Sequence, residues 1–152
     1  MQSALPALLA RMFCCFLMTG LTSSVRAGEF PAGSPRFATT YQDFLAEQKR
    51  TGKPSVIVFS APWCSSCQAM KRKIYPAGPV KRYHDQFVWA YLNVEDPANF
   101  EANKKYQTAG LPHLEFLNAK GQSVARLLGK KDAKTLAAQL SAILAKTPAG
   151  PR

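Results

Sequence analysis

Two short apolar runs are the clearest pattern in this sequence. Residues 55–60 read Ser-Val-Ile-Val-Phe-Ser, and residues 87–94 read Phe-Val-Trp-Ala-Tyr-Leu-Asn-Val. Runs of this length, without a polar face and rich in β-branched or aromatic side chains, indicate strands that are buried on both faces. Two further strands are predicted at residues 113–117 and 123–128, and the turn residues 118–121 between them indicate a hairpin.

Helix signals separate these runs. Thr40 is typical of a helix start, because its hydroxyl can accept a hydrogen bond from a free backbone N–H, and Gly52 is typical of the end. Further helices are predicted at residues 64–74, 97–106 and 132–145. The order is therefore β-α-β units followed by a hairpin and a closing helix, which predicts an α/β protein with a mixed sheet.

The length of 152 residues, 47% of them hydrophobic, fits one globular domain. Residues 28–38 contain two prolines and two glycines, which predicts an extended, flexible leader. Residues 39–147 are predicted to form the domain, and residues 148–152 a disordered tail. The sequence shows no internal repeat and no second domain boundary.

Residues 1–27 have the pattern of a secretory signal peptide. Arg11 precedes an apolar stretch from Met12 to Leu21, and Val25-Arg26-Ala27 places small residues where a signal peptidase cleaves. An uncleaved membrane anchor is the alternative, but about 10 apolar residues are too few for a hydrocarbon core that needs roughly 20. We therefore expect export to the periplasm, with cleavage after Ala27.

Removal of this segment changes the cysteine count. Of the 4 cysteines, Cys14 and Cys15 lie within the signal, so the mature chain keeps Cys64 and Cys67. Two cysteines three positions apart usually form a disulfide in an oxidising compartment, and so short a loop adds little stability. The pair is therefore better explained by redox chemistry than by structural cross-linking.

The chain is basic, and its net charge falls from +11 to +9 without Arg11 and Arg26. A basic surface suits nucleic acid, an anionic membrane face or acidic protein partners. Its lysines and arginines are scattered, apart from a compact run at residues 71–73, and no nucleic-acid-binding motif is present. We therefore expect no nucleic-acid partner.

Cys64 follows the strand at residues 55–60 after a three-residue turn and precedes a helix. In this context it lies at the helix N-terminus, where free N–H groups and the helix dipole stabilise a thiolate. Cys67 follows about one turn later on the same face. Because the thiolate is the reactive form, Cys64 is the predicted nucleophile and Cys67 the resolving thiol. Residues 71–73 either add positive potential or form a solvated helix face.

Residues 59–67, Phe-Ser-Ala-Pro-Trp-Cys-Ser-Ser-Cys, resemble the active-site segment of the thioredoxin family, and Gly110-Leu111-Pro112 resembles its cis-proline loop. A bare CxxC also fits zinc sites, but Trp63 before it, a buried strand upstream and the Gly-x-Pro about 45 residues downstream make the pattern specific. The resemblance covers roughly Thr40 to Ala145. It implies a thioredoxin-like fold, with a central mixed sheet between helices in three α/β/α layers.

The resemblance also implies roles for individual residues. Cys64 attacks the disulfide of a partner protein, and Cys67 resolves the mixed disulfide. Pro112, in the cis form, lies against the pair, and Leu111 offers backbone groups to an extended substrate segment. Trp63 packs beside the cysteines, with a core aromatic as the alternative interpretation.

Several positions depart from the family pattern. The buried aspartate of thioredoxins is replaced by Val58, the lysine that accompanies it by Tyr91, and a helix-kinking proline by Arg72. Ser65-Ser66 stand where Gly-Pro is usual. The chain therefore looks closer to exported relatives, such as the thioredoxin-like domain of the bacterial transmembrane reductant transporter and proteins that reduce cytochrome c apoproteins.

His113 and Glu115 follow Pro112 at the strand period, so their side chains are expected on one face of the sheet. They are candidates for a proton relay that replaces the missing aspartate. The alternative is a hydrogen-bonded pair without a catalytic part.

We predict an exported thiol-disulfide oxidoreductase that uses a redox-active CxxC pair, acts on protein disulfides or dithiols, and works as a reductase. A membrane or periplasmic thiol is the expected electron donor, and a monomer is expected. An oxidase remains an alternative, as does a copper- or zinc-binding protein that uses the two thiolates. No cofactor and no resident metal are expected, since dinucleotide-binding glycines and a second ligand pair are missing from the sequence.

Overall fold

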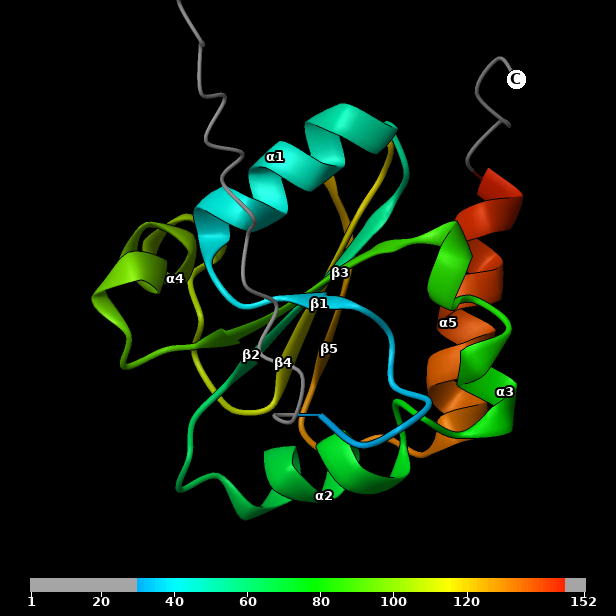
Figure 1. The fold of residues 1–152 in the computed structure, drawn as a ribbon, viewed down its shortest axis with the longest axis horizontal. Coiled ribbons are helices and arrows are strands. Elements are labelled where there is room, and N and C mark those ends of the chain that lie inside the picture. The colour runs from blue at the N-terminus through cyan, green and yellow to red at the C-terminus, as the bar shows by residue number, and fades with distance from the viewer. Residues whose placement is uncertain (1–29, 147–152) are drawn as a thin grey trace, which may run out of the picture.

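A five-stranded mixed sheet forms the centre of the computed structural model, which describes residues 30–146 (Figure 1). The strand order is β1-β3-β2-β4-β5, in which β1, β3 and β2 run parallel while β4 and β5 add antiparallel strands. The strands are β1 Phe37–Ala38, β2 Ser55–Ser60, β3 Val88–Asn93, β4 His113–Leu117 and β5 Ser123–Leu128. The predicted bounds of β2, β4 and β5 are confirmed, and β3 is one residue shorter at each end than predicted.

Helices cover both faces of this sheet. They are α1 Tyr41–Thr51, α2 Ser65–Lys73, α3 Gly78–Lys81, α4 Phe100–Tyr106 and α5 Ala133–Lys146, with 3-10 turns η1 His84–Gln86 and η2 Pro97–Asn99. The mixed sheet with flanking helices confirms the predicted fold class. The predicted start of α2 at Cys64 is confirmed, its end is one residue earlier than predicted, and the sequence pattern did not reveal α3. Within residues 30–146, no helix is long and apolar enough to span a membrane.

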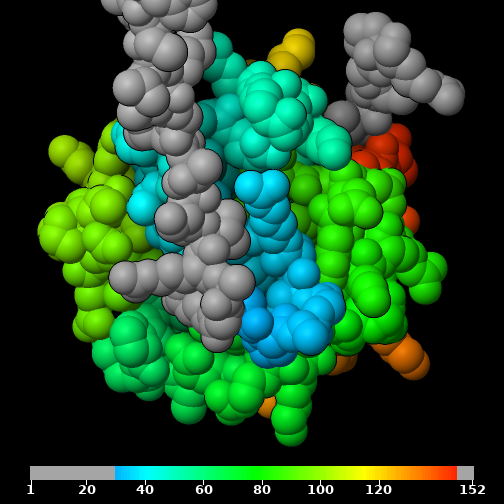
Figure 2. All heavy atoms as spheres, in the orientation of Figure 1, coloured from blue at the N-terminus to red at the C-terminus, as the bar shows by residue number. Residues whose placement is uncertain are grey.

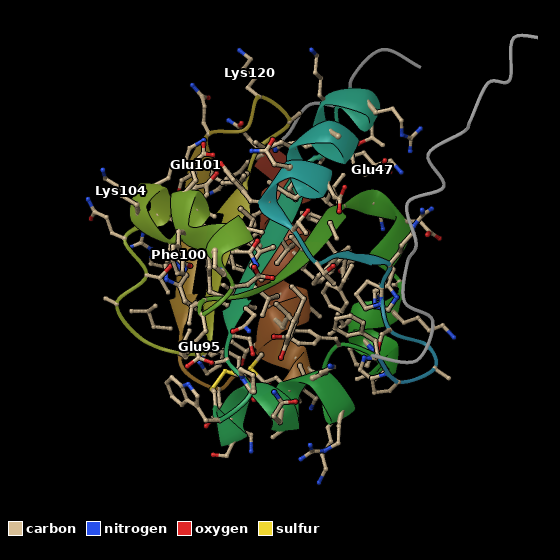
Figure 3. All side chains as sticks on the ribbon, turned by 60° about the vertical axis from the view of Figure 1, so that its left-hand side comes forward. Glu47, Glu95, Phe100, Glu101, Lys104 and Lys120 are labelled. Atoms are coloured by element: carbon tan, nitrogen blue, oxygen red, sulfur yellow. A yellow bond between two sulfur atoms is a disulfide. The ribbon has the colours of Figure 1, made fainter. Side chains whose placement is uncertain are left out.

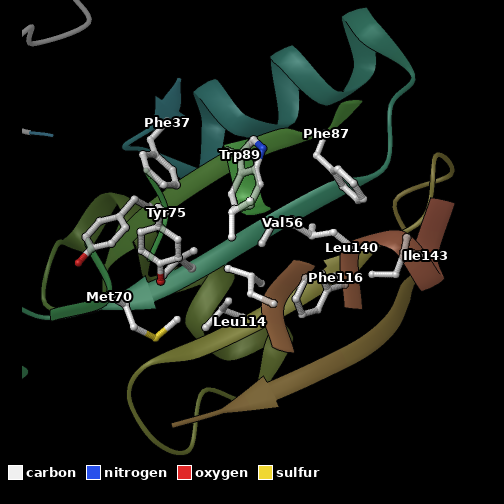
Figure 4. Close-up of a cluster of buried hydrophobic side chains, with 14 residues drawn as sticks. Phe37, Val56, Met70, Tyr75, Phe87, Trp89, Leu114, Phe116, Leu140 and Ile143 are labelled. Atoms are coloured by element: carbon white, nitrogen blue, oxygen red, sulfur yellow. The ribbon is translucent and has the colours of Figure 1, made fainter. Parts of the chain in front are cut away.

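The central strand β2 is apolar on both faces because both faces are covered. Val56 and Val58 point into a cluster that includes Met70 of α2 and, from α3 and α5, Val80 and Leu136. Figure 4 shows this cluster, in which Trp89 and Phe116 are among the large side chains. The alternate β2 residues Ile57 and Phe59 pack in a second cluster, with side chains from α1 and α4.

Helix α1 has the ends that the sequence predicted. The Thr40 hydroxyl accepts a hydrogen bond from the Asp43 N–H at 3.2 Å, which satisfies one free donor of the first turn. Gly52 ends the helix with a φ of 61°, a left-handed conformation that favours glycine. Tyr41 and Phe44 supply the buried face of α1.

The predicted flexible leader at residues 28–38 is wrong for the residues that the structure describes. Phe37 pairs with Trp89 in the sheet and is 5% exposed. The Phe30 ring lies 4.7 Å from the Phe37 ring and 5.2 Å from the Tyr91 ring, measured between centroids. Figure 2 shows the blue segment that begins at residue 30 lying against green atoms of later elements. Two aromatic side chains thus hold a proline-rich segment in place, and the folded domain begins before residue 39.

The predicted signal peptide at residues 1–27 and the predicted tail at residues 148–152 lie outside the described residues.

Phe37→Ala tests whether this N-terminal segment is part of the core. We expect it to lower the free energy of unfolding by about 3–5 kcal/mol, the usual cost of truncating a buried phenylalanine. Phe100→Ala is the matched control, because Phe100 is 54% exposed and its loss should cost about 0.5 kcal/mol or less. Urea denaturation measures both values. Equal small losses in the two variants would show that the segment is not packed.

Candidate functional site

Cys64 and Cys67 form a disulfide at the start of α2, with their Cα atoms 5.2 Å apart. Figure 3 shows it as the yellow bond beside the first turn of that helix. Cys64 is the N-cap residue of α2, and its Sγ accepts a hydrogen bond from the Cys67 N–H at 3.2 Å. This confirms the predicted position of Cys64, where a thiolate would receive backbone hydrogen bonds and the favourable end of the helix dipole.

The two sulfur-bearing residues differ in exposure. Cys64 is 7% exposed, whereas Cys67 is 0% exposed. They pack with Ala61, and the half-buried side chains of Val94 and Leu111 lie against them. Cys64 is therefore the more exposed residue of the pair.

The loop before β4 lies beside the disulfide. The Leu111–Pro112 peptide bond is cis, as the resemblance implied. The Gly129 N–H donates to the Pro112 carbonyl at 2.8 Å, and Leu111 packs against the cysteines. The sequence positions 111–112 and 64–67, far apart in the chain, thus meet at one end of the sheet.

Trp63 lies on the surface beside the cysteine pair. It is 68% exposed, so the alternative interpretation as a core aromatic is wrong. Its indole N–H donates to Glu95 Oε1 at 2.8 Å, which fixes the ring's orientation. Glu95 was not predicted as a site residue. Its one indication in the sequence is that it is an acidic residue just after β3.

The Lys71 ammonium lies over two aromatic rings. It lies 4.3 Å from the Phe30 ring centroid and 5.4 Å from that of Tyr91. Lys71 stands seven residues after Cys64, about 10 Å along a helix that rises 1.5 Å per residue. The basic run at residues 71–73 is therefore in the last turn of α2, and Lys71 forms cation–π contacts with both rings.

His113 and Glu115 form a buried hydrogen-bonded pair, with His113 Nε2 2.7 Å from Glu115 Oε2. The Ser123 hydroxyl donates to Glu115 Oε1, and Arg126 Nε donates to Glu115 Oε2 at 2.8 Å. Burial by itself raises the pKa of Glu115, but these hydrogen bonds and the Arg126 charge outweigh it and hold that pKa below its usual range. Glu115 is thus held as a carboxylate by three donors.

The pair lies on the α1/α4 side of the sheet. His113 is opposite Phe59 in the β2–β4 register, and the two rings are 5.1 Å apart. Val58, at the position of the aspartate in thioredoxins, points to the other face. Among residues 30–146, the hydrogen-bond partner of His113 Nε2 is Glu115 and not a cysteine. These contacts favour the hydrogen-bonded pair, and the proton relay through His113 and Glu115 stays a prediction.

The sequence pattern of thioredoxin-like domains matches residues 41–144. This chain belongs to the thioredoxin-like domain family. Among its relatives, a thiol:disulfide interchange protein TxlA homolog from Synechocystis is 31% identical over 104 residues, which are 68% of this chain and 57% of that protein. The thiol:disulfide interchange protein DsbD of Vibrio cholerae is 35% identical over 92 residues, which are 58% of this chain and 15% of DsbD.

Among solved structures, a thioredoxin from Thermus thermophilus superposes with a TM-score of 0.67 at 27% identity, covering 76% of this chain and 92% of that one. Its likeness supports the thioredoxin-like fold. The chain spans a little over half the length of the TxlA proteins that it matches.

This thioredoxin-like domain has a hydroxyl pair near the position where the family has a charged pair. The Ser60 and Tyr91 hydroxyl oxygens are 2.7 Å apart and buried. Tyr91 was noted in the sequence as the replacement of a lysine, but Ser60 was missed. The one indication of Ser60 in the sequence is a polar residue at the end of a largely apolar strand.

The CxxC pair also suggested a metal-binding site. Within residues 30–146, no group of three or more histidine, cysteine, aspartate or glutamate side chains is placed to hold a metal ion. The two sulfurs are instead joined to each other.

Glu115→Gln tests the role of the buried carboxylate in the thioredoxin-like domain. At about pH 7 we expect the free energy of unfolding to fall by about 1–3 kcal/mol, because a neutral amide replaces an acceptor of charge-assisted hydrogen bonds. The folded-state pKa of Glu115 lies below the unfolded value of about 4.3. Its contribution is therefore present above about pH 4.3 and is lost as the pH falls through the folded-state pKa.

The stability difference between wild type and Glu115→Gln should thus narrow when urea titrations are repeated at decreasing pH below about 4. Glu101→Gln, at an exposed position, is the control and should leave stability nearly unchanged. A difference for Glu115→Gln that stays constant from neutral to acidic pH would contradict a stabilising carboxylate.

Proposed function

We propose that this protein is an exported thiol-disulfide oxidoreductase that exchanges disulfides with partner proteins and works as a reductase. The observation that carries the proposal is the Cys64–Cys67 disulfide, which begins at a helix N-cap and lies beside the cis Leu111–Pro112 loop. The family and the thiol:disulfide interchange relatives support the same chemistry.

In the reductive direction, the Cys64 thiolate attacks one sulfur of a partner's disulfide. A mixed disulfide forms, and the other partner sulfur leaves as a thiolate that takes up a proton. The Cys67 thiol then loses its proton and attacks Cys64 Sγ, which releases the second partner sulfur and forms the Cys64–Cys67 disulfide. Two electrons pass to the partner, and no other redox group takes part. The greater exposure of Cys64 supports its role as the first nucleophile.

The surface around Cys64 suits an extended protein segment. The exposed Trp63 indole offers a flat apolar contact that Glu95 holds in place. Leu111 packs against the pair and precedes the cis bond to Pro112. An extended partner segment would pair with the Leu111 backbone as an added strand. We therefore assign substrate binding to Trp63, Leu111 and Pro112.

The sequence resemblance to reductant-handling exported proteins supports the reductive direction. A cation close to the nucleophilic sulfur would stabilise the thiolate and make the pair more oxidising. Lys71, the first basic residue after Cys64, lies over the rings of Phe30 and Tyr91. A periplasmic or membrane thiol that returns electrons to the pair, and action as a monomer, complete the proposal.

Cys64→Ser and Cys67→Ser separate the two proposed roles. In a chain whose Cys14 and Cys15 are replaced by serine, Cys64→Ser should abolish reduction of a disulfide-containing protein such as insulin by dithiothreitol. Cys67→Ser should also lose turnover but accumulate a mixed disulfide through Cys64, seen as a mass increase that dithiothreitol reverses. Trapping through Cys67 in the Cys64→Ser variant would reverse the assignment.

Failure of the wild-type pair to turn over, together with stoichiometric zinc or copper in the reduced protein, would instead support the metal-binding alternative.

A further inference from the structure

Ser60 and Tyr91 form a buried polar contact on a largely apolar face of the sheet. Ser60 is 1% exposed and Tyr91 is 7% exposed, and their hydroxyl oxygens are 2.7 Å apart. Each hydroxyl carries one proton, so when Tyr91 donates to Ser60 Oγ the Ser60 proton stays available for another acceptor. The pair thus offers one directed donor within a low-dielectric environment.

This donor lies on the side of the sheet that α2 covers. Successive β2 side chains alternate between faces, which places Ser60 on the same face as Val58 and Val56. Met70 of α2 packs in that cluster, and Cys67 is the other buried residue of α2. Ser60 ends β2, and four residues later Cys64 begins the helix. The hydroxyl pair is therefore at the end of the sheet where the first turn of α2 begins.

Tyr91 reaches this place from the neighbouring strand. It is opposite Val58 in the parallel β2–β3 register, and Lys71, one turn after Cys67 on α2, lies over its ring. Phe30 packs edge-on against the same ring. These contacts fix the Tyr91 ring, so that its hydroxyl is held at Ser60 rather than free to rotate into solvent.

The resolving step needs such a group. Cys67 is fully buried, and burial in apolar surroundings disfavours the thiolate that must attack Cys64. The side chain at position 58 is a valine, which offers neither a hydrogen bond nor a charge. A polar group that stabilises the Cys67 thiolate must therefore come from another residue.

We propose that Ser60 and Tyr91 are positioning residues for the resolving thiol: the Tyr91 hydroxyl donates to Ser60, and the Ser60 hydroxyl donates to the Cys67 thiolate while the mixed disulfide is resolved. The inference rests on the proposed function and specifies how its second step is supported. The hydroxyls stay protonated throughout. The thiol proton passes to solvent or to the departing partner thiolate, so the pair lowers the cost of ionisation without accepting a proton.

Lys71 and Tyr75, from α2 and the segment after it, are titratable groups that face Tyr91. The Lys71 ammonium lies 5.4 Å from the centroid of the Tyr91 ring. Tyr75 lies 6.3 Å from Tyr91 between ring centroids, and burial raises its pKa well above the usual value. Tyr75 is therefore neutral at physiological pH, and its hydroxyl, which has no hydrogen-bond partner within residues 30–146, provides a matched control.

The test is a single-turnover measurement of mixed-disulfide resolution across pH. The full chain with Cys14 and Cys15 replaced by serine is reduced and mixed with an aryl disulfide, and release of the second aryl thiolate reports the Cys67 attack. Ser60→Ala should move the midpoint of the pH–rate profile upward by about one unit, since a hydrogen bond to a charged group has about that value. The rate near neutral pH should then fall about ten-fold, while rates at high pH converge.

Tyr91→Phe should shift the midpoint in the same direction by less, because it removes the donor to Ser60 but keeps the ring. Tyr75→Phe should leave the profile unchanged, and Ser60→Thr, which keeps a hydroxyl, should restore most of the wild-type profile. A merely structural role would lower the rates equally at every pH.

If the pH–rate profiles of wild type, Ser60→Ala and Tyr91→Phe superpose, the inference is overturned while the proposed function stays intact. Absence of any second-thiolate release in the wild type would instead overturn the proposed function itself.

Discussion

β2 is buried along its whole length between two layers of helices, and the place where it ends determines where the reactive groups lie. A shift of register by one residue would exchange the side chains that pack in the two different clusters, because odd and even positions of the strand face opposite sides. Its end therefore places Cys64 at the first turn of α2 with little freedom. The antiparallel pairing with β4 brings the Pro112 loop to the same end.

The two faces of the sheet contribute in different ways. On the α1/α4 face, Glu115 is a buried carboxylate with three donors, a set of contacts that fits a stabilising role. On the α2/α5 face, Val58 and Tyr91 stand at the positions of the charged pair of thioredoxins, and Ser60 and Tyr91 form a buried hydroxyl contact. Neutral hydroxyls cost less to bury than an unpaired charge.

Much of this arrangement was predictable because it is local in sequence. The bounds of β2, β4 and β5 follow from apolar runs and turn residues, and the ends of α1 follow from Thr40 and Gly52. The position of Cys64 at a helix N-cap follows from the strand–turn–helix order. The other residues of the site were predicted from the resemblance to a family and not from periodicity.

The features that sequence reasoning missed are contacts between distant segments. Trp63 and Glu95 are 32 residues apart, and Ser60 and Tyr91 are 31 apart, so no periodic pattern connects them. The strand β1 has two residues, which is too short for an alternation to be seen. Its packing depends on Phe30 and Phe37, whose aromatic contacts outweigh the local preference of a proline-rich stretch for an extended, solvated chain.

The reduction potential of the Cys64–Cys67 pair tests the central claim most directly. It is measured by equilibrating the chain that lacks Cys14 and Cys15 with dithiothreitol and glutathione buffers, and by quantifying the free thiols at each ratio. A protein that donates electrons to partner disulfides should have a value near the thioredoxin end of the range, about −270 mV. A value near about −120 mV would identify an oxidant and contradict the reductase.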